Sequence, residues 1–180
     1  MTSWNKLAQK LRVPLGTILG ILFLLWMHPS AKSLFIGGLI TLPGCLLRLW
    51  AAGHIEKGRV LTQSGPYGFT RNPLYLGSFF MALGIIIAGQ GYWLLPAFSA
   101  FFVVFYFPVI KAEEQELLSG YGERFREYSR RVPMFIPAFR KNTGSVSSFR
   151  WSRVICNREH RNIAGLMIAE AILILQFLSR

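Results

Sequence analysis

Cysteine is rare in this sequence. The 180 residues include two, Cys45 in an apolar stretch and Cys156 in a basic one. Two distant cysteines form no disulfide framework, and neither stands at a metal-ligand spacing from other cysteines or histidines. The sequence therefore excludes a disulfide-stapled scaffold and predicts no metal site or redox role. We expect Cys45 to be a buried packing residue.

Charged residues are also scarce. They make up 16% of the chain, while hydrophobic residues make up 52%. Soluble domains carry about 25% charged residues. The apolar residues here are grouped in blocks rather than spread at a helical period. This pattern favours an integral membrane protein over a soluble one, and the length predicts a single domain.

The apolar blocks predict an all-α membrane bundle of about five transmembrane helices, followed after the fourth by a cytoplasmic amphipathic helix. The first block follows basic residues, as in a signal peptide, but the later blocks favour a membrane span. The third and fourth are near the lower limit for spanning, about 17 residues. The expected spans are 13–27, 33–47, 73–88, 92–110 and 163–178. The single domain (1–180) divides into a helical hairpin (1–47), a core (48–140) and a loop with a C-terminal helix (141–180).

Small residues predict how the first two spans pack. Gly16 and Gly20 are four residues apart in the first span, and Gly37, Thr41 and Cys45 form one stripe on the second. Small residues let two membrane helices approach closely. We therefore expect these two helices to pack against each other through them.

Basic residues are distributed unevenly between the two sides of this topology. Eighteen of the 20 Lys and Arg residues fall in the N-terminal segment, the connection 48–72 and the segment 111–162; the other two are Lys32 and Arg180. Cytoplasmic loops of membrane proteins carry such an excess. The N-terminus and the long loops are therefore predicted to be cytoplasmic, near anionic headgroups. The net charge of +12 needs no nucleic-acid partner.

The stretch before the third span contains the first half of a candidate site. Asn72 can cap the next helix and Pro73 suits its first position. Arg71 then stands beside a helix N-terminus, which attracts anions. With Tyr67 and Tyr75 nearby, this predicts a site for a small molecule that carries a carboxylate; the alternative is a simple turn back into the bilayer. From residue 65 the stretch reads Gly-Pro-Tyr-Gly-Phe-Thr-Arg-Asn-Pro-Leu-Tyr-Leu-Gly.

The second half follows the fourth span. Glu113 and Glu114 come directly after it, at the membrane level of Arg71. On a continuous helix Glu114 lies within about 40° of an aromatic stripe. That stripe comprises Leu118, Tyr121, Phe125 and Tyr128, and a break at Gly120 or Gly122 would end its phase. The alternative is a solvated acidic start to an amphipathic helix.

Two prolines, Pro133 and Pro137, enclose a stiff apolar segment with the sequence Met-Phe-Ile. Proline restricts its own backbone and that of the residue before it. We expect the segment 132–137 to lie across the cytoplasmic mouth of the bundle. The polar residues 141–148 that follow predict a flexible loop.

Three motifs in this order resemble the isoprenylcysteine carboxyl methyltransferase and phospholipid methyltransferase superfamily. They are Gly-Pro-Tyr with Arg-Asn-Pro-Leu-Tyr-Leu-Gly, then Glu-Glu with Tyr-Gly-Glu-Arg-Phe-Arg-Glu-Tyr, then Val-Pro-Met-Phe-Ile-Pro, all within about residues 45–140. The resemblance implies a small membrane enzyme that uses S-adenosylmethionine without a soluble nucleotide-binding fold. The absence of a G-x-G-x-x-G loop agrees with this.

The resemblance implies a cofactor site in this sequence, and at one position of that site the sequence differs from the family's motif. Arg71 and Glu114 are the expected catalytic residues. The family's histidine before the proline is Asn72 here, which cannot shuttle a proton near neutral pH. A mechanism that needs a histidine base is therefore in doubt. The residues assigned to the cofactor are Gly65, Pro66, Tyr67, Arg71, Asn72, Tyr75, Glu113, Glu114, Tyr128 and Phe135.

The expected chemistry follows from the cofactor's groups. Arg71 would bind its carboxylate, Glu113 or Glu114 its ammonium or ribose, and Tyr67, Tyr75 and Phe135 its adenine. A lipophilic carboxylate or thiolate acceptor needs no general base. A phospholipid amine would need one, and Glu114 is the candidate. A non-catalytic lipid-binding protein and a nicotinamide-dependent membrane reductase remain alternatives.

Four further polar residues have two interpretations each. Glu170 lies within the last span, either lining an acceptor tunnel or protonated and bonded to a neighbouring helix. His54 is expected on the cytosolic surface, with substrate contact as the alternative. Arg158 and Glu159 are expected to be topological charges, with closure of the site as the alternative.

Overall fold

The computed structural model describes residues 3–56, 60–138 and 148–180, and every regular element in these ranges is helical. The expected all-α fold is therefore confirmed for them. The elements are α1 (Ser3–Leu25), α2 (Ala31–His54), η1 (Gly65–Gly68), α3 (Pro73–Ala88), η2 (Tyr92–Leu94), α4 (Leu95–Phe101), η3 (Phe102–Tyr106), α5 (Phe107–Tyr121), α6 (Glu123–Arg131), α7 (Trp151–Cys156) and α8 (Glu159–Leu178). The expected loop 141–148 lies, except for residue 148, outside the described residues.

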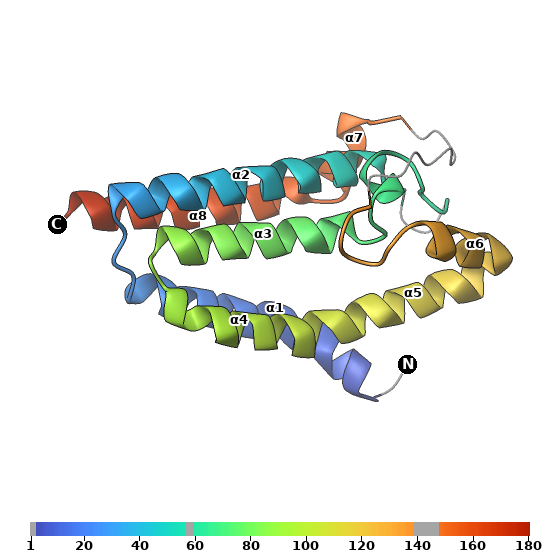
Figure 1. Ribbon diagram of the computed structural model, residues 1–180, viewed down its shortest axis with the longest axis horizontal. Coiled ribbons are helices and arrows are strands. Elements are labelled where there is room, and N and C mark those ends of the chain that lie inside the picture. Colours follow the sequence, from blue (N-terminus) through green and yellow to red (C-terminus); the bar gives the residue numbers. More distant parts are fainter. Residues whose placement is uncertain (1–2, 57–59, 139–147) are drawn as a thin grey trace.

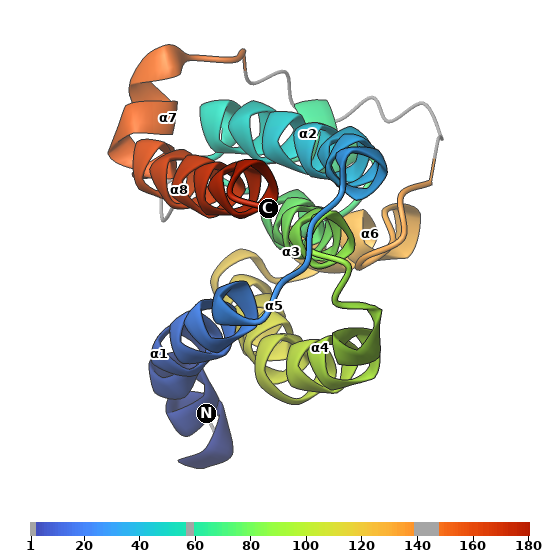
Figure 2. The ribbon, with the colours of Figure 1, turned by 90° about the vertical axis from the view of Figure 1, so that its left-hand side faces the viewer.

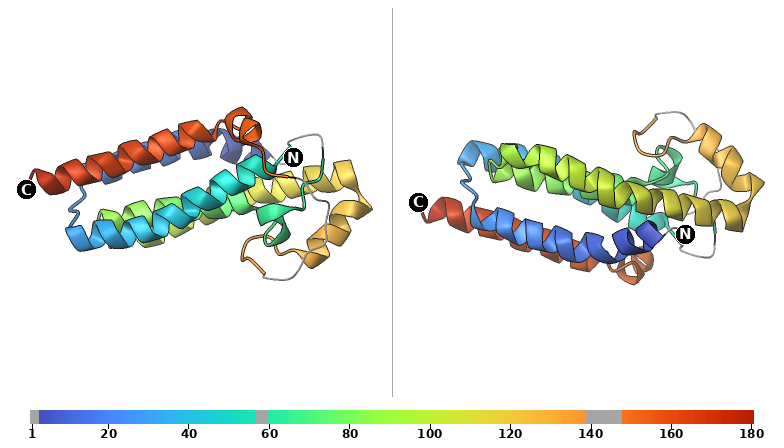
Figure 3. Two further views of the ribbon diagram at one scale, coloured as in Figure 1. Left: turned by 90° about the horizontal axis from the view of Figure 1, so that it is seen from above. Right: turned by 90° about the horizontal axis from the view of Figure 1, so that it is seen from below.

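The long helices form two groups (Figures 1 and 2). α2, α3 and α8 pack against one another, and α1 lies beside the long helix made by α4, η3 and α5. The views from above and below show that the axes of the long helices lie roughly along one direction (Figure 3). The end of α2, the start of α3, the end of α5 and the start of α8 therefore meet at one end of the bundle, with η1, α6 and α7. We call this the loop end.

α2 is longer than the sequence predicted. Ser30 and Ser33 form a capping box at its start, and the Ser33 hydroxyl also donates to Ala88 O (2.8 Å). The expected span ended at residue 47, but the helix continues to His54. His54 is buried rather than exposed, with 8% of its surface accessible, and its ring lies near those of Trp50 and Phe149.

The C-terminal carbonyls of α2 are satisfied by a distant segment. Arg153 of α7 pairs with Glu56, and Asn157 donates to Ala52 O (3.0 Å). Arg150 N donates to Gly53 O (2.9 Å). Orphan carbonyls at a helix end need such partners. This long-range capping explains why α2 extends through a stretch whose composition predicted a loop.

Small residues pack α2 against α3, not against α1 as predicted. A Cβ on Gly84 would lie 2.7 Å from Gly37 O and Thr41 N, so side chains are excluded at this crossing. A Cβ on Gly44 would likewise lie 2.8 Å from Gly77 O. Cys45, expected to be buried, is only half-buried. The stripe was correctly recognised, but its partner helix was not.

The fourth helix passes its predicted end without interruption. A π-helical turn, η3, joins α4 to α5, and the helix runs on to Tyr121. It breaks where Gly122 adopts a φ of +54°, which favours glycine. The predicted stripe is therefore interrupted, yet Phe125 and Tyr128 of α6 still pack with Leu118 and Tyr121.

Three helices in the described ranges are long and apolar enough to cross a membrane, fewer than the five expected. They are α2, the segment Tyr92–Tyr121 and α8. The apolar part of α1 covers only Pro14–Leu25, and α3 has 16 residues. Both fall short of the roughly 20 residues that a span needs. Large apolar side chains face outward on the long helices, as expected for surfaces that contact lipid.

Candidate functional site

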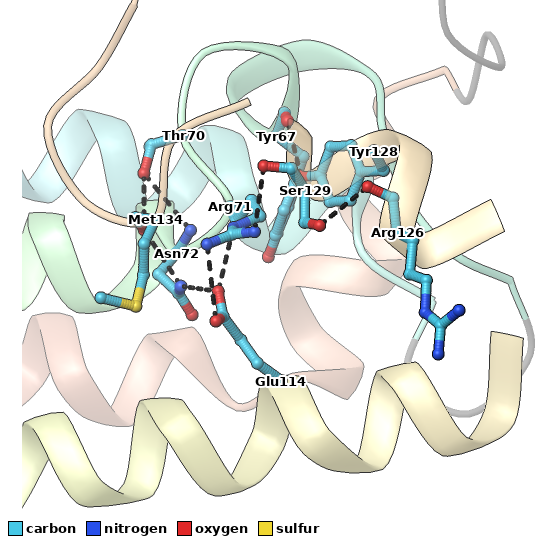
Figure 4. Close-up of polar contacts among 9 residues, drawn as sticks. All are labelled: Tyr67, Thr70, Arg71, Asn72, Glu114, Arg126, Tyr128, Ser129 and Met134. Atoms are coloured by element: carbon cyan, nitrogen blue, oxygen red, sulfur yellow. Dashed lines mark hydrogen bonds and ion pairs between the residues drawn. The ribbon is translucent and has the colours of Figure 1, made fainter. Parts of the chain in front are cut away.

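Arg71 and Glu114 meet at the loop end. Arg71 precedes α3, and Glu114 belongs to α5 (Figure 4). Arg71 Nε lies 2.9 Å from Glu114 Oε1, and Nη2 donates to Oε2 at 3.5 Å. The Nε–H is not directed at the oxygen, so this closest approach is an ion contact without a hydrogen bond. Both side chains are mostly buried, with exposures of 14% and 16%. The predicted convergence of these two residues is present.

The proline-bounded segment lies over the start of α3. Arg71 N donates to Pro133 O (2.9 Å), and Ala138 N donates to Phe69 O (3.0 Å). The Thr70 hydroxyl donates to Met134 O (3.2 Å). These bonds fix the chain at residues 69–71, so the guanidinium of Arg71 starts from a defined position. The Arg71 Nη1 group also donates to Ser129 O at 3.3 Å.

Asn72 does not cap α3 as predicted. Its side-chain amide donates to Met134 O (3.0 Å) and to Glu114 Oε1 (3.5 Å), and makes no capping bond to α3. The nearby Met134 carbonyl draws the amide away from the helix (Figure 4). Pro73 has no N–H to cap, which reduces the need. Asn72 therefore links Glu114 to the covering segment.

Glu113 and Glu114 bind different partners. Consecutive residues on a helix point about 100° apart. The Tyr75 hydroxyl donates to Glu113 Oε1 at 2.7 Å, and the Tyr75 ring meets that of Tyr106 edge-on. The two carboxylates therefore bind on either side of the first turn of α3, one through Tyr75 and the other through Arg71.

Tyr67 contributes a buried hydroxyl without a hydrogen-bond partner among the described residues. Its carbonyl accepts a bond from the Tyr128 hydroxyl (2.7 Å), which holds η1 on α6. Burial raises the pKa of both phenols above its ordinary value of 10.0, so both are protonated at neutral pH. Gly65 (φ +58°) faces the His54 ring rather than open space. Pro66 is fully buried.

The aromatic side chains expected around the adenine do not form one cluster. The Phe135 ring contacts those of Phe79 and Phe102 at 6.0 and 5.5 Å, between α3 and η3. Within the described residues no ring contact joins Phe135 to Tyr67 or Tyr75. Phe135 therefore packs with aromatic side chains of α3 and η3 instead of with Tyr67 and Tyr75.

The sequence did not predict a second Arg–Glu pair near the site. Glu159, expected to be a topological charge, is buried and accepts bonds from Arg48 Nε (3.0 Å) and Nη2 (2.6 Å). Arg48 was expected to begin a loop, but it lies within α2. The only signal was an acid at the start of an apolar helix, which the helix dipole also explains.

Glu170 lies half-buried on α8, with no hydrogen bond or ion pair to any residue in the described ranges. Neither proposed role for it is supported by a contact. Nor do residues 3–56, 60–138 and 148–180 contain a group of three or more potential metal-binding His, Cys, Asp or Glu side chains.

Comparison with known proteins identifies the family to which the chain belongs. The model of the phospholipid methyltransferase family matches residues 33–124, about half of the chain. The cobalt-zinc-cadmium resistance protein CzcN of Cupriavidus metallidurans is 34% identical over 69% of this chain and 60% of its own length. The protein-S-isoprenylcysteine O-methyltransferase of Schizosaccharomyces pombe is 26% identical over 75% and 59%.

A third relative has a name from another enzyme class. The Delta(14)-sterol reductase of Mus musculus is 38% identical over 59% of this chain and 22% of its own length. The chain thus spans about 60% or less of these relatives. No solved structure matches it. The family match covers both halves of the site, from Arg71 to Glu114, and shows that the chain belongs to the phospholipid methyltransferase family.

Proposed function

We propose that this protein transfers a methyl group from S-adenosylmethionine to a lipophilic, membrane-associated acceptor, with a carboxylate or a thiolate favoured. The convergence of Arg71 and Glu114 under the proline-bounded segment carries the proposal, because it places a cation and an anion together at the mouth of a membrane bundle. Family membership agrees with methyl transfer.

The charges of the pair suit the amino-acid end of this cofactor. That end carries one carboxylate and one ammonium. Binding would exchange the internal ion contact for two others, Arg71 with the carboxylate and Glu114 with the ammonium, without changing the net charge of the site. Although the guanidinium and the carboxylate approach to 2.9 Å, the hydrogen bonds to Glu114 are long, at 3.5 Å from both Arg71 Nη2 and Asn72 Nδ2, so ligand groups can replace them with better ones.

The remaining polar groups fit a nucleoside. Glu113 can accept a hydrogen bond from a ribose hydroxyl while it keeps the bond from Tyr75. The Tyr67 hydroxyl is buried without a partner among the described residues, which costs about 1–3 kcal/mol unless a ligand atom satisfies it. These residues fit the cofactor by their donor and acceptor types.

Positioning is the main contribution that this chain would make to the reaction. When bound, S-adenosylmethionine supplies an electrophilic methyl group on a sulfonium. Arg71 and Glu114 would orient it, and the segment 132–137 would exclude water. An anionic acceptor suits this site because a low-dielectric environment favours the neutralisation of opposite charges. Asn72 cannot act as a base near neutral pH, so an amine acceptor would depend on a glutamate.

The membrane arrangement supports a lipid-attached acceptor. We propose that α1 and α3 also cross the bilayer, tilted or locally short, which restores five crossings. The loop end is proposed to face the cytoplasm, because among the described residues the opposite end carries only Lys32 and Arg180 as Lys or Arg cations. An acceptor would then reach the site sideways from the bilayer, past the aromatic side chains around Phe135.

A membrane reductase is the second candidate, because the sterol reductase relative matches 59% of the chain. The two functions need different ligands. Calorimetric titration of the purified protein in detergent with S-adenosylhomocysteine and, separately, with NADPH distinguishes them. We expect binding of the first only; binding of NADPH alone would refute the methyltransferase proposal.

Variants test whether the ligand occupies this site. Arg71→Ala and Glu114→Ala should each weaken binding of S-adenosylhomocysteine by tenfold or more. Arg126→Ala is the matched control, because Arg126 forms an exposed pair with Glu123 on α6, at the same end. Equal loss in the control would show that the site lies elsewhere.

The acceptor class follows from a transfer assay with a total lipid extract. With methyl-labelled cofactor, label that base treatment releases as volatile methanol indicates a methyl ester, and label that stays non-volatile indicates transfer to sulfur or nitrogen. The absence of transfer to any lipid, despite cofactor binding, would contradict a lipophilic acceptor.

A further inference from the structure

The Arg48–Glu159 pair joins three helices at the loop end. Arg48 is near the end of α2, and Glu159 is the first residue of α8. The two bonds between them are parallel and short, and the side chains are 15% and 4% exposed. This is the bidentate geometry in which Arg binds a carboxylate most strongly.

The same guanidinium also binds α3. Arg48 Nη1 donates to Leu74 O (3.1 Å) and to the Ser78 hydroxyl, and that hydroxyl donates to Leu74 O as well (2.9 Å). A Cβ on Gly77 would lie 2.5 Å from Arg48 Cγ, so only glycine leaves room for the side chain to cross α3. The pair therefore holds the first two turns of α3 through bonds separate from those of the proline-bounded segment.

Two residues of the candidate site, Arg71 and Tyr75, lie just before and within the first turn of α3. Leu74 is three residues after Arg71, and Tyr75 follows it. The bonds of Thr70, Arg71 and Asn72 to the segment 132–137 hold the residues just before this turn, and Arg48 binds the turn itself at Leu74 O. Glu159 lies outside the part of the chain that matches the family, 33–124.

We propose that Arg48 and Glu159 are positioning residues, which set the place of Arg71 and Tyr75 by fixing the start of α3, and through which α8 contributes to the site. The effect on ligand affinity rests on the proposed function; the effect on α3 does not.

The test removes the pair without leaving a buried charge. Replacing both members of a buried ion pair by apolar residues of similar size is often neutral for stability. We expect Arg48→Met/Glu159→Met to fold, to bind S-adenosylhomocysteine about tenfold more weakly, and to exchange the amide hydrogens of residues 76–78 faster than wild type. A role in stability alone predicts unchanged affinity, and any faster exchange would be shared by the other helices rather than confined to the start of α3.

The matched control is Arg153→Met/Glu56→Met. In this pair Arg153 is mostly buried and Glu56 is half-buried at the loop end, but the pair holds α7 to the end of α2. We expect ligand affinity and α3 exchange to stay at wild-type values. Wild-type affinity and exchange in the Arg48 double variant, or equal changes in the control, would overturn the proposal.

Two further outcomes keep the proposal testable. If the double variant does not fold, Arg48→Lys keeps the charge beside Glu159 but cannot reproduce the planar set of bonds to α3. Unchanged exchange at residues 76–78 in that variant would refute the positioning role. If the wild-type protein does not bind S-adenosylhomocysteine, the proposed function fails, and the exchange measurement alone decides whether the pair positions α3.

Discussion

Two Arg–Glu pairs near the start of α3 differ in how completely they are bonded. Arg48 and Glu159 share two short hydrogen bonds, and the third donor group of Arg48 binds Leu74 and Ser78. Arg71 and Glu114 share one long hydrogen bond and one ion contact whose N–H points elsewhere.

The difference separates a structural pair from an exchangeable one. A fully bonded buried pair loses much when one partner is removed, because the other charge is left without compensation. A poorly bonded pair has little to lose when a ligand takes its place. We therefore expect the first pair to dominate stability and the second to dominate ligand binding.

The largest expected effect is on stability. Glu159→Ala leaves the Arg48 guanidinium buried without a counter-charge and should cost about 3 kcal/mol or more. Glu114→Ala also leaves a mostly buried guanidinium, that of Arg71, without its counter-charge, but it should cost less because the hydrogen bonds that it removes are long. Thermal unfolding in detergent measures both, and equal losses would remove the distinction between the pairs.

Ligand binding should show a different order. Arg71→Ala removes a charged hydrogen-bond donor, worth about 1.5–3 kcal/mol, and should weaken S-adenosylhomocysteine binding by tenfold or more. Arg71→Lys keeps the charge but not the fork of donors, and should recover only part of the affinity. Calorimetry checks this, and full recovery by Lys would show that only the charge matters.

Tyr67→Phe should have opposite effects on stability and binding. Removing this buried hydroxyl, which has no partner in the part of the chain that the structure describes, should stabilise the ligand-free protein by about 1 kcal/mol, because the cost of desolvation disappears. Binding should become a few-fold weaker, by about 1 kcal/mol, if a ligand atom bonds this hydroxyl. Unfolding temperatures with and without ligand measure both; a loss of stability without ligand would show that the hydroxyl is already satisfied.

The smallest effect concerns alkaline pH. Burial raises the pKa of Tyr67 in the folded protein above 10.0. Below the pKa that Tyr67 has in the unfolded protein, its phenol is protonated in both states and the free energy of unfolding does not depend on its titration. As pH rises above that pKa, the unfolded state loses the proton first, and the free energy of unfolding falls. Unfolding temperatures should therefore fall above about pH 10. They should fall less steeply in Tyr67→Phe, and identical slopes would contradict burial of the phenol.

Local signals predicted one helix and the meeting of two site residues. α3 begins and ends where expected, because Pro73 suits a first helical position and glycine follows Ala88. α3 and the long helix of α4, η3 and α5 run in opposite directions, so the start of α3 lies near α5. Arg71, before α3, and Glu114, in α5, therefore meet. Their roles in binding stay predictions.

Long-range contacts account for what the sequence did not predict. The end of α2 depends on Arg153 and Asn157 of a distant segment. Arg48 can be mostly buried because it pairs with Glu159, a residue 111 positions later in the sequence. The orientation of Asn72 depends on a backbone carbonyl of the covering segment. No periodicity or motif encodes these partners, because each is brought close only by the finished fold.

The uneven placement of cations has a consequence for how an acceptor would arrive. Arginines cluster at the loop end, while the other end carries Lys32 and Arg180. Such a positive surface attracts anionic lipids over about a Debye length, roughly 8 Å in physiological salt. An amphiphile with a negative head would therefore accumulate in the leaflet around the protein before it binds. Its search would become two-dimensional and short, and high salt would slow its capture without changing the chemistry.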